Sequence, residues 1–145
     1  MILKSFELTK IKLNNYKFYL FYGDNEGLKE EHVKNLFEKN YIDKIHRYEE
    51  KEILDNINIF FNSVLTKSFF DNEKLIIINR ATDKIRTVIE DLMEKNPEDI
   101  QIILNSKNLE KKSTLRKLFE KEKSILCIPF YEDNNQTLNS IISLF

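Results

Sequence analysis

The sequence predicts an α/β domain of the three-layer, doubly wound kind, in which helices cover both faces of a mostly parallel, five-stranded sheet. Five apolar runs are separated by helical patterns along the chain, and strands that alternate with helices form parallel sheets. The run at 74–79 lacks the alternation of a half-exposed strand, as expected for a strand buried on both faces. The 145 residues are enough for one domain with a single core.

The first strand and helix are predicted on either side of a glycine-containing turn. The run at 17–22 is rich in residues with β propensity, and the turn at 23–27 follows it. Asp24 or Asn25 can cap the helix that begins after this turn. Three apolar residues share one face of that helix: Val33, Leu36 and Phe37.

The second unit comprises a short strand at 44–48 and a helix at about 50–65. Apolar residues recur in this helix at intervals of three and four, which places them on one inward face. They are Ile53, Ile57, Phe60, Phe61, Val64 and Leu65. The buried strand at 74–79 comes next.

The sequence after the 74–79 strand predicts three helices and two strands. Asp83 can cap a helix that ends at Asn96-Pro97, and strands follow at 100–104 and 124–129 with a basic helix at 111–122 between them. The apolar stripes of the three helices are Ile85, Val88, Ile89, Leu92 and Met93; Leu115, Leu118 and Phe119; and, in a last helix, Leu138, Ile141, Ile142 and Phe145.

Composition excludes several classes of protein. The formal net charge of -1 gives no global attraction to nucleic acid, so any such contact needs a local patch. Cys127 is the only cysteine, which excludes disulfides, CxxC redox chemistry and cysteine-rich zinc sites within the chain. The N-terminus has no signal-peptide pattern and no apolar run is long enough to span a membrane. We therefore expect a cytoplasmic protein.

The turn after the first strand is the place to test for a phosphate site, because it holds both glycines of the chain. A P-loop has the pattern G-x-x-x-x-G-K-[ST], whose backbone N–H groups and lysine bind the phosphates. Gly23 and Gly27 are one residue too close, Lys29 does not follow Gly27 directly, and Glu30 replaces the hydroxyl residue. Neighbouring acidic residues would repel a triphosphate. The turn therefore fits a capped helix start better than a nucleotide loop.

The ends of the third and fourth strands give the same result. A P-loop ATPase needs an acid that holds magnesium at the end of the third strand, whereas this strand ends in Asn79-Arg80. A phosphoacceptor receiver domain is disfavoured too, since it needs an aspartate there. Asn105, after the fourth strand, is either a sensor of nucleotide or a hydrogen-bonded loop cap, and the defective loop favours the cap.

No catalytic residue, metal ligand or cofactor site is predicted. His32 and His46 have no His or Cys partner at ligand spacing, and no Ser/His/Asp or Cys/His order stands out. One charge cluster, at 107–123, holds seven basic and three acidic residues. A solvated helix face explains such a cluster, and the alternative is a surface that contacts DNA or another subunit in an assembly. The residues of that candidate surface are Lys111, Lys112, Arg116 and Lys117.

An aromatic pair, Phe69 and Phe70, lies between the 50–65 helix and the 74–79 strand. Polar residues flank the pair on both sides, so it lies on a turn where at least one ring is hard to bury. Either the rings close the end of the core, or at least one of them anchors a partner.

Four blocks of the chain are typical of one protein family: FYLFYGDNEGLKEE, SFFDNEKLIIINRATD, NLEKKSTLRKLFEKE and PFYEDNNQTL. In order and spacing they resemble the N-terminal domain of the delta subunit of bacterial DNA polymerase III, the clamp-loader subunit that opens the sliding clamp. This resemblance covers nearly the whole chain.

The resemblance implies an AAA+ fold without a functional P-loop and no intrinsic enzymatic activity. It implies that the turn formed by Ser68, Phe69 and Phe70 binds the sliding clamp (beta), although Phe69 stands where Leu is more usual. It also implies that residues 1–145 are one domain, that further helical domains, absent from this chain, bind the other clamp-loader subunits, and that DNA is contacted only within the assembly.

Two classes of function stay open at this point. One is a non-catalytic module that binds and helps to open the sliding clamp during DNA replication. The other is a small nucleotide-binding or hydrolysing α/β domain, and the lysine-serine/threonine step missing after Gly27 discriminates against it. The zinc-bearing delta-prime relative needs several cysteines, and the ATP-hydrolysing gamma or tau relative needs the P-loop.

Overall fold

Five parallel strands form the central sheet of the structure, a computed structural model that describes residues 1–66 and 73–131. The strands are β1 (Phe18–Tyr22), β2 (Ile45–Glu49), β3 (Lys74–Asn79), β4 (Ile100–Asn105) and β5 (Leu126–Pro129), and their order across the sheet is β2-β3-β4-β1-β5. All neighbouring strands are parallel. The predicted α/β fold with a mostly parallel, five-stranded sheet is confirmed.

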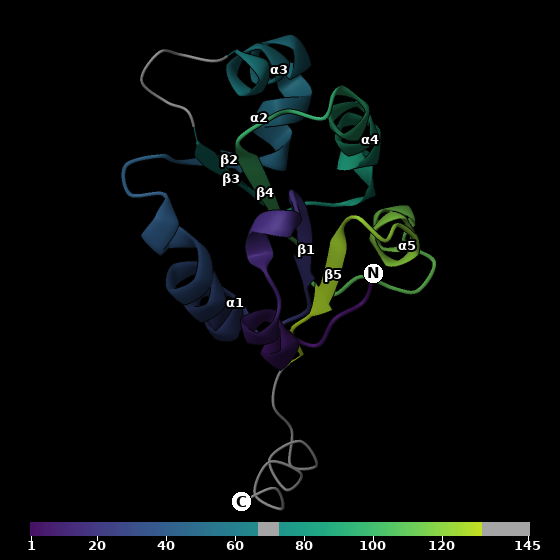
Figure 1. Cartoon of the computed structure of the whole chain (residues 1–145). Coiled ribbons are helices and arrows are strands. Elements are labelled where there is room, and N and C mark those ends of the chain that lie inside the picture. Colours follow the sequence, from purple (N-terminus) through teal and green to yellow (C-terminus); the bar gives the residue numbers. More distant parts are fainter. Residues whose placement is uncertain (67–72, 132–145) are drawn as a thin grey trace, which may run out of the picture.

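Helices cover both faces of this sheet, as predicted (Figure 1). The helices are α1 (Glu26–His32), α2 (Glu50–Asp55), α3 (Ile57–Leu65), α4 (Arg86–Lys95) and α5 (Thr114–Lys121). A π-helical turn, Val33–Phe37, extends α1, and 3-10 turns lie at Ser5–Lys10, Leu13–Asn15, Glu38–Asn40 and Asp83–Ile85. The predicted last helix, which carries Leu138 and Phe145, lies outside the described residues.

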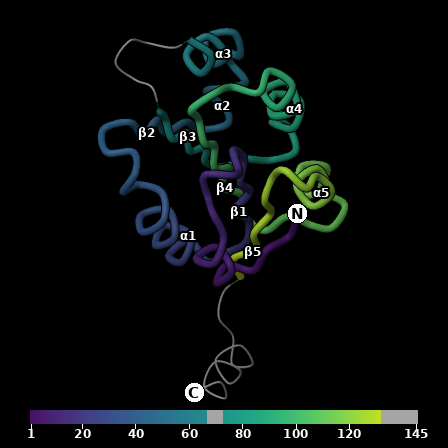
Figure 2. The backbone as a smooth tube through the Cα atoms, viewed as in Figure 1, coloured from purple at the N-terminus to yellow at the C-terminus, as the bar shows by residue number. Residues whose placement is uncertain are grey.

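Two separate cores flank the sheet, because successive side chains of each strand point to opposite faces. Leu20 of β1 packs with residues from α2, α3, α4 and α5 on one face. Tyr19 and Phe21 pack on the other face with Leu8, Phe37 and the apolar side of α1. The tube in Figure 2 shows α1 and α5 on opposite sides of the sheet. The strands are therefore buried on both sides, which explains their continuous apolar runs.

The helix predicted at 50–65 is broken into α2 and α3. Asn56 adopts a non-helical conformation, with φ −146° and ψ 64°. Ile57 and Leu65 are the two end residues of α3 and are each 37% exposed, whereas Phe60 and Val64 within the helix are buried. The prediction that Ile57 and Leu65 face the core is wrong for this reason.

Asp83 was expected to cap α4 but caps another helix. The hydroxyl of Thr82 accepts the hydrogen bond from Lys84 N–H at the start of that segment, at 3.3 Å. The carboxylate of Asp83 instead accepts hydrogen bonds from the hydroxyl of Ser113 and, at 3.1 Å, from Leu115 N–H, so it caps α5. Partial burial opposes ionisation, but these hydrogen bonds outweigh it and lower the pKa of Asp83.

Gln101 on β4 connects the sheet to the segments that cover one face. It is buried, and its Nε2 donates to the carbonyls of Leu13 at 2.8 Å and Tyr16 at 2.9 Å. Its Oε1 accepts from the hydroxyl of Tyr41 at 2.8 Å. Burial, together with the nearby carboxylates of Glu73 and Asp99, raises the pKa of Tyr41 to about 12, so this hydroxyl remains a donor at neutral pH.

The substitution Gln101→Leu is predicted to destabilise the fold more than removal of one of its partners. It removes the partner of the Tyr41 hydroxyl and of the Tyr16 carbonyl and one of the donors to the Leu13 carbonyl, at a cost of about 2–4 kcal/mol in the free energy of unfolding. The control Tyr41→Phe keeps both bonds from Nε2 and is expected to cost about 1 kcal/mol. Urea denaturation followed by circular dichroism measures both, and equal losses would contradict the role given to Gln101.

Candidate functional site

The carboxyl ends of β1 and β4 are where this architecture would place a ligand. β1 leads to α1 on one face, and β4 leads to α5 on the other, so the two loops diverge at neighbouring strands. In open α/β sheets, ligands bind in the crevice at such a switch point. Here the loops bond to each other, because Gly23 N–H donates to the carbonyl of Lys107 at 3.2 Å.

Only one of the two glycines in the first loop is required by the geometry. Gly23 has φ +115°, and a Cβ at this position would lie 2.1 Å from the carbonyl oxygen of Phe130. The chain after β5 therefore packs directly on the glycine. A Cβ on Gly27 would meet nothing closer than Asn25 Oδ1 at 3.9 Å, so this second glycine is not needed for packing.

Backbone donors of this loop are used within the protein. Besides the bond from Gly23, Asn25 N–H donates to the carbonyl of Phe130 at 3.0 Å, and Leu28 N–H donates to Asn25 Oδ1 at 3.1 Å. Asn25 is thus the cap of α1, one of the two residues predicted for this role. A phosphate site uses such N–H groups for its anion, whereas here they stabilise the loop.

Lys29 is the residue nearest in character to a P-loop lysine, and it is buried with 2% of its surface exposed. Its ammonium donates to the carbonyl of Ser106 at 2.6 Å and to Glu26 Oε1 at 3.0 Å. The carboxylate of Glu26 therefore supplies the negative charge that a buried ammonium needs. The lysine ties α1 to the loop after β4.

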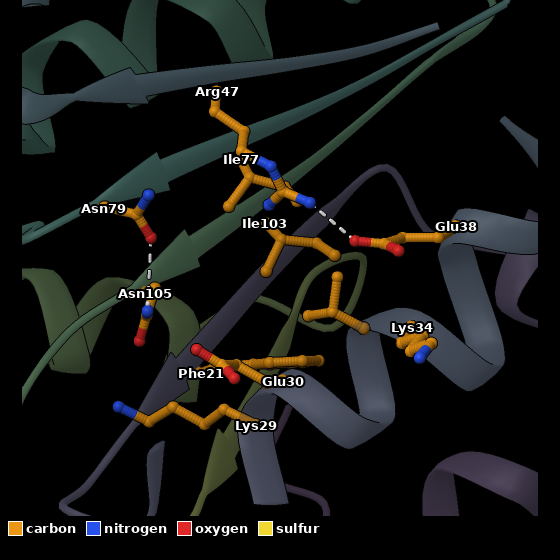
Figure 3. Close-up of a pocket in the computed structure, with 11 residues that line it drawn as sticks. Phe21, Lys29, Glu30, Lys34, Glu38, Arg47, Ile77, Asn79, Ile103 and Asn105 are labelled. Carbon is orange, nitrogen blue, oxygen red and sulfur yellow. Dashed lines mark hydrogen bonds and ion pairs between the residues drawn. The ribbon is translucent and has the colours of Figure 1, made fainter. Parts of the chain in front are cut away.

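Asn79 and Asn105, at the ends of β3 and β4, bond to each other. Asn105 Nδ2 donates to Asn79 Oδ1 at 3.2 Å and lies 3.5 Å from Glu26 Oε2. These contacts agree with the interpretation of Asn105 as a hydrogen-bonded cap. Figure 3 shows both amides at the edge of a cavity of about 320 Å³ between α1 and the sheet, with Ile103 and Phe21 in its lining.

The histidines and the acidic residues form no metal site in the structure. In residues 1–66 and 73–131, no group of three or more His, Cys, Asp or Glu side chains could hold a metal ion. His32 Nδ1 lies 2.9 Å from the carbonyl of Leu28, and His46 is exposed on β2. None of the helices in these ranges has the length and apolar character needed to cross a membrane.

The four residues of the candidate basic surface have different environments. Lys111, Lys112 and Lys117 are exposed, and Lys112 pairs with Glu110 at 3.2 Å. Arg116 has a side chain only 14% exposed. Its guanidinium lies over the ring of Tyr22, 4.9 Å from the centroid, and donates to the carbonyl of Leu109 at 2.7 Å. Arg116 is therefore bound within the domain, which argues against its place on a contact surface.

Helix α3, which precedes the aromatic pair in the chain, has apolar side chains that are exposed to solvent. Ile59 is 66% exposed, and Ile57 and Leu65 are also exposed. A helix that is apolar on more than its buried face is typical of a protein interface. Ser68, Phe69 and Phe70 themselves lie outside the described residues.

Comparison with known proteins identifies the family. The family model for the DNA polymerase III delta subunit matches residues 19–128. The chain belongs to the delta-subunit family. A solved structure, the Bacillus subtilis DNA clamp loader delta protein (YqeN), shares 15% sequence identity and superposes with a TM-score of 0.66, which shows a similar fold. The match covers 93% of this chain and 43% of that one, so the chain spans less than half of the YqeN length. No curated protein matches the chain.

Three polar contacts of this delta-family domain were not predicted from the sequence. They join Lys29 to Ser106, Asp83 to Ser113, and Glu50 to Thr82, whose N–H and hydroxyl donate to the Glu50 carboxylate at 2.8 to 3.0 Å. Each contact links residues at least 30 positions apart in the chain, so no local sequence pattern predicts it.

The substitution Glu26→Gln is predicted to destabilise the domain, because it leaves the buried ammonium of Lys29 without a charged partner. Since solvent reaches Glu26, we expect a loss of about 1–2 kcal/mol in the free energy of unfolding, below the cost of breaking a fully buried pair. Glu31→Gln, an exposed site on the same helix, is the matched control and is expected to change stability by less than about 0.5 kcal/mol. Equal urea midpoints for the two variants would refute the pairing.

Proposed function

We propose that this chain acts as the N-terminal domain of a clamp-loader delta subunit, a cytoplasmic protein that binds the DNA sliding clamp and helps to open it during replication. The domain itself catalyses no reaction. Further helical domains outside this chain bind the other clamp-loader subunits. Membership of the delta family supports this assignment.

The observation that carries the proposal is the exposed apolar surface of α3. This helix ends at Leu65, three residues before Ser68, Phe69 and Phe70. Ile57, Ile59 and Leu65 add apolar surface on the helix that leads to the turn. Buried aromatic anchors dominate the energy of many interfaces, so the two phenylalanines are the residues that we assign to the pocket of the clamp.

In the first loop, groups that could bind a phosphate already have hydrogen-bond partners within the protein, which supports a function without nucleotide. A bound phosphate would have to displace Glu26 from Lys29 and break the backbone hydrogen bonds of Gly23 and Asn25. Each of these bonds satisfies a group that is costly to leave unpaired. The loop therefore contributes to the stability of the domain instead of binding ATP.

Calorimetric titration of the chain with Mg-ATP is predicted to give no binding heat. The reason is that backbone donors of the loop already have partners and that an acidic side chain lies beside Lys29, the one lysine that is buried in residues 1–66 and 73–131. A control titration without magnesium separates metal-dependent from unspecific heats. Magnesium-dependent binding with a Kd of about 1–10 μM would refute this prediction.

The variants Phe69→Ala and Phe70→Ala are predicted to lose clamp binding without losing stability. Truncation of an anchor that enters the clamp pocket costs on the order of 2 kcal/mol or more of binding free energy. Truncation of a core phenylalanine would cost about 3–5 kcal/mol of folding free energy instead. The measurements are Kd for the sliding clamp of the same organism and the melting temperature.

Phe61→Ala provides a matched control for these two variants. Phe61 lies on α3 and packs against the core, with its ring centroid 6.2 Å from that of Phe60. This variant is expected to lower the melting temperature while the folded fraction keeps its clamp affinity. Full clamp binding by both Phe69→Ala and Phe70→Ala would show that the anchors are elsewhere.

We also propose that Lys111, Lys112 and Lys117 face nucleic acid or another subunit within the full assembly. They are exposed near the start and along the outer side of α5. The isolated domain is expected to bind duplex DNA poorly, because three lysines neutralise few phosphates. Fluorescence anisotropy at physiological salt measures this, and a Kd below about 1 μM for the wild-type chain would contradict it.

A further inference from the structure

The α-amino group of Met1 lies at the C-terminal end of α5. Its nitrogen is 2.6 Å from the carbonyl oxygen of Phe119, 2.6 Å from that of Glu122 and 2.8 Å from that of Ile125. An ammonium group carries three N–H donors, and here each donor has one carbonyl acceptor. The hydrogen-bonding capacity of this group is therefore filled by residues that lie 118 to 124 positions later in the chain.

The C-terminal end of α5 is capped by this ammonium instead of a glycine. The helix ends at Lys121, and the next residue, Glu122, is extended, with φ −78° and ψ 132°. Glycine, the usual residue after a helix, does not occur in the sequence after position 27. The last carbonyls of a helix lack partners within it and carry the negative end of the helix dipole, so a cation is favourable there.

The first three residues also lie along the edge of the sheet. Cys127 N–H, in β5, donates to the carbonyl of Met1 at 2.9 Å, and Leu3 N–H donates to the carbonyl of Cys127 at 3.0 Å. Ile2 and Cys127 thereby form a parallel bridge. Because β5 is an edge strand, these bonds cover backbone groups that would otherwise have no strand partner. Met1 thus connects the end of α5 to β5.

We infer that the α-amino group of Met1 is a modification-sensitive site: a formyl or acetyl group on this nitrogen releases the end of α5 from the edge of the sheet. An acylated nitrogen is an amide, which is uncharged and has one N–H, so two of the three carbonyls lose their donor. The loss of these partly buried hydrogen bonds lowers stability. The acyl oxygen is itself an acceptor and repels the carbonyls around the nitrogen.

The formyl group is the acyl group of interest, because bacterial protein synthesis starts with formylmethionine. On Met1 it is removed by hydrolysis: a hydroxyl from water joins the formyl carbon, the C–N bond breaks, and formate and the free amine are the products. Deformylation would therefore precede the cap on α5. This inference is independent of the proposed function, since none of its residues belongs to the clamp-binding turn.

Cys127, the only cysteine of the chain, reports whether α5 stays against β5. Its side chain is fully buried in one cluster with Leu115, Leu118 and Phe119 of α5. A pyridyl disulfide reagent reaches the thiol only when this packing opens. The labelling rate of Cys127 therefore measures how often the end of α5 leaves the sheet.

The experiment compares the whole chain with a free amino terminus and the same chain with N-formylmethionine, produced in cells treated with a deformylase inhibitor and verified by mass spectrometry. Lys12→Gln, which removes one exposed positive charge near the N-terminus, is the control. The measurements are the labelling rate of Cys127, amide hydrogen exchange at Leu3 and the melting temperature. Partial burial lowers the pKa of the Met1 amino group, although Glu120 and Glu122 oppose this, so all measurements are made at about pH 6, where the ammonium predominates.

Formylation is expected to speed labelling and Leu3 exchange about tenfold and to lower the melting temperature by about 5 °C, and treatment with deformylase is expected to restore the original values. Lys12→Gln is expected to change both rates less than about twofold. The inference is overturned if the formylated chain keeps the rates of the free chain, or if Lys12→Gln changes them equally. A formylated chain that fails to fold supports the inference if deformylation restores its fold and overturns it otherwise.

Discussion

The burial of the Lys29 ammonium is the constraint on which the carboxyl edge of the sheet depends. A buried cation must be surrounded by acceptors, and here the carbonyl of Ser106 and the carboxylate of Glu26 provide them. The contact with Ser106 joins α1 to the loop after β4 at the point where the two chain segments diverge to opposite faces, and Glu26, on α1 itself, balances the charge of the ammonium. At that point, hydrogen-bond donors that this topology would offer to a ligand are thus used by the protein itself.

The same edge of the sheet is fixed by further polar contacts toward α5 and α2. Asp83 bonds to the start of α5, and Glu50 bonds to Thr82 beside it. Ser106, whose carbonyl accepts from Lys29, also bonds to Ala81 through its hydroxyl. Three helices, α1, α2 and α5, are therefore joined by neighbouring residues of two loops. A substitution in one of these contacts is expected to couple to the others, because they share partners.

Most of the sheet could be predicted from the sequence, because strands buried on both faces need apolar residues at every position. The defects of the first loop were also visible, since a phosphate site requires particular residues at fixed spacing. The break at Asn56 was not predicted, because the apolar spacing continues across it without a proline or glycine. Arg116 was assigned to the candidate surface for DNA or another subunit, but its burial depends on Tyr22 and on the carbonyl of Leu109, which the fold brings near.

The residues that depart from a phosphate-binding loop also fix α1 to the loop after β4. Glu26 is unfavourable beside a phosphate, yet it stabilises the ammonium of Lys29 when no phosphate is present. In an ATPase, this lysine must be available to bind the phosphates of the ligand. A domain whose role is to present a protein-binding turn instead needs its helices in fixed positions. In this chain the internal hydrogen bonds of the first loop help to fix the edge of the sheet from which α2 and α3 extend. Under the proposed clamp-binding function, helices that are fixed at this edge leave less ordering to be done when a partner binds, which favours affinity.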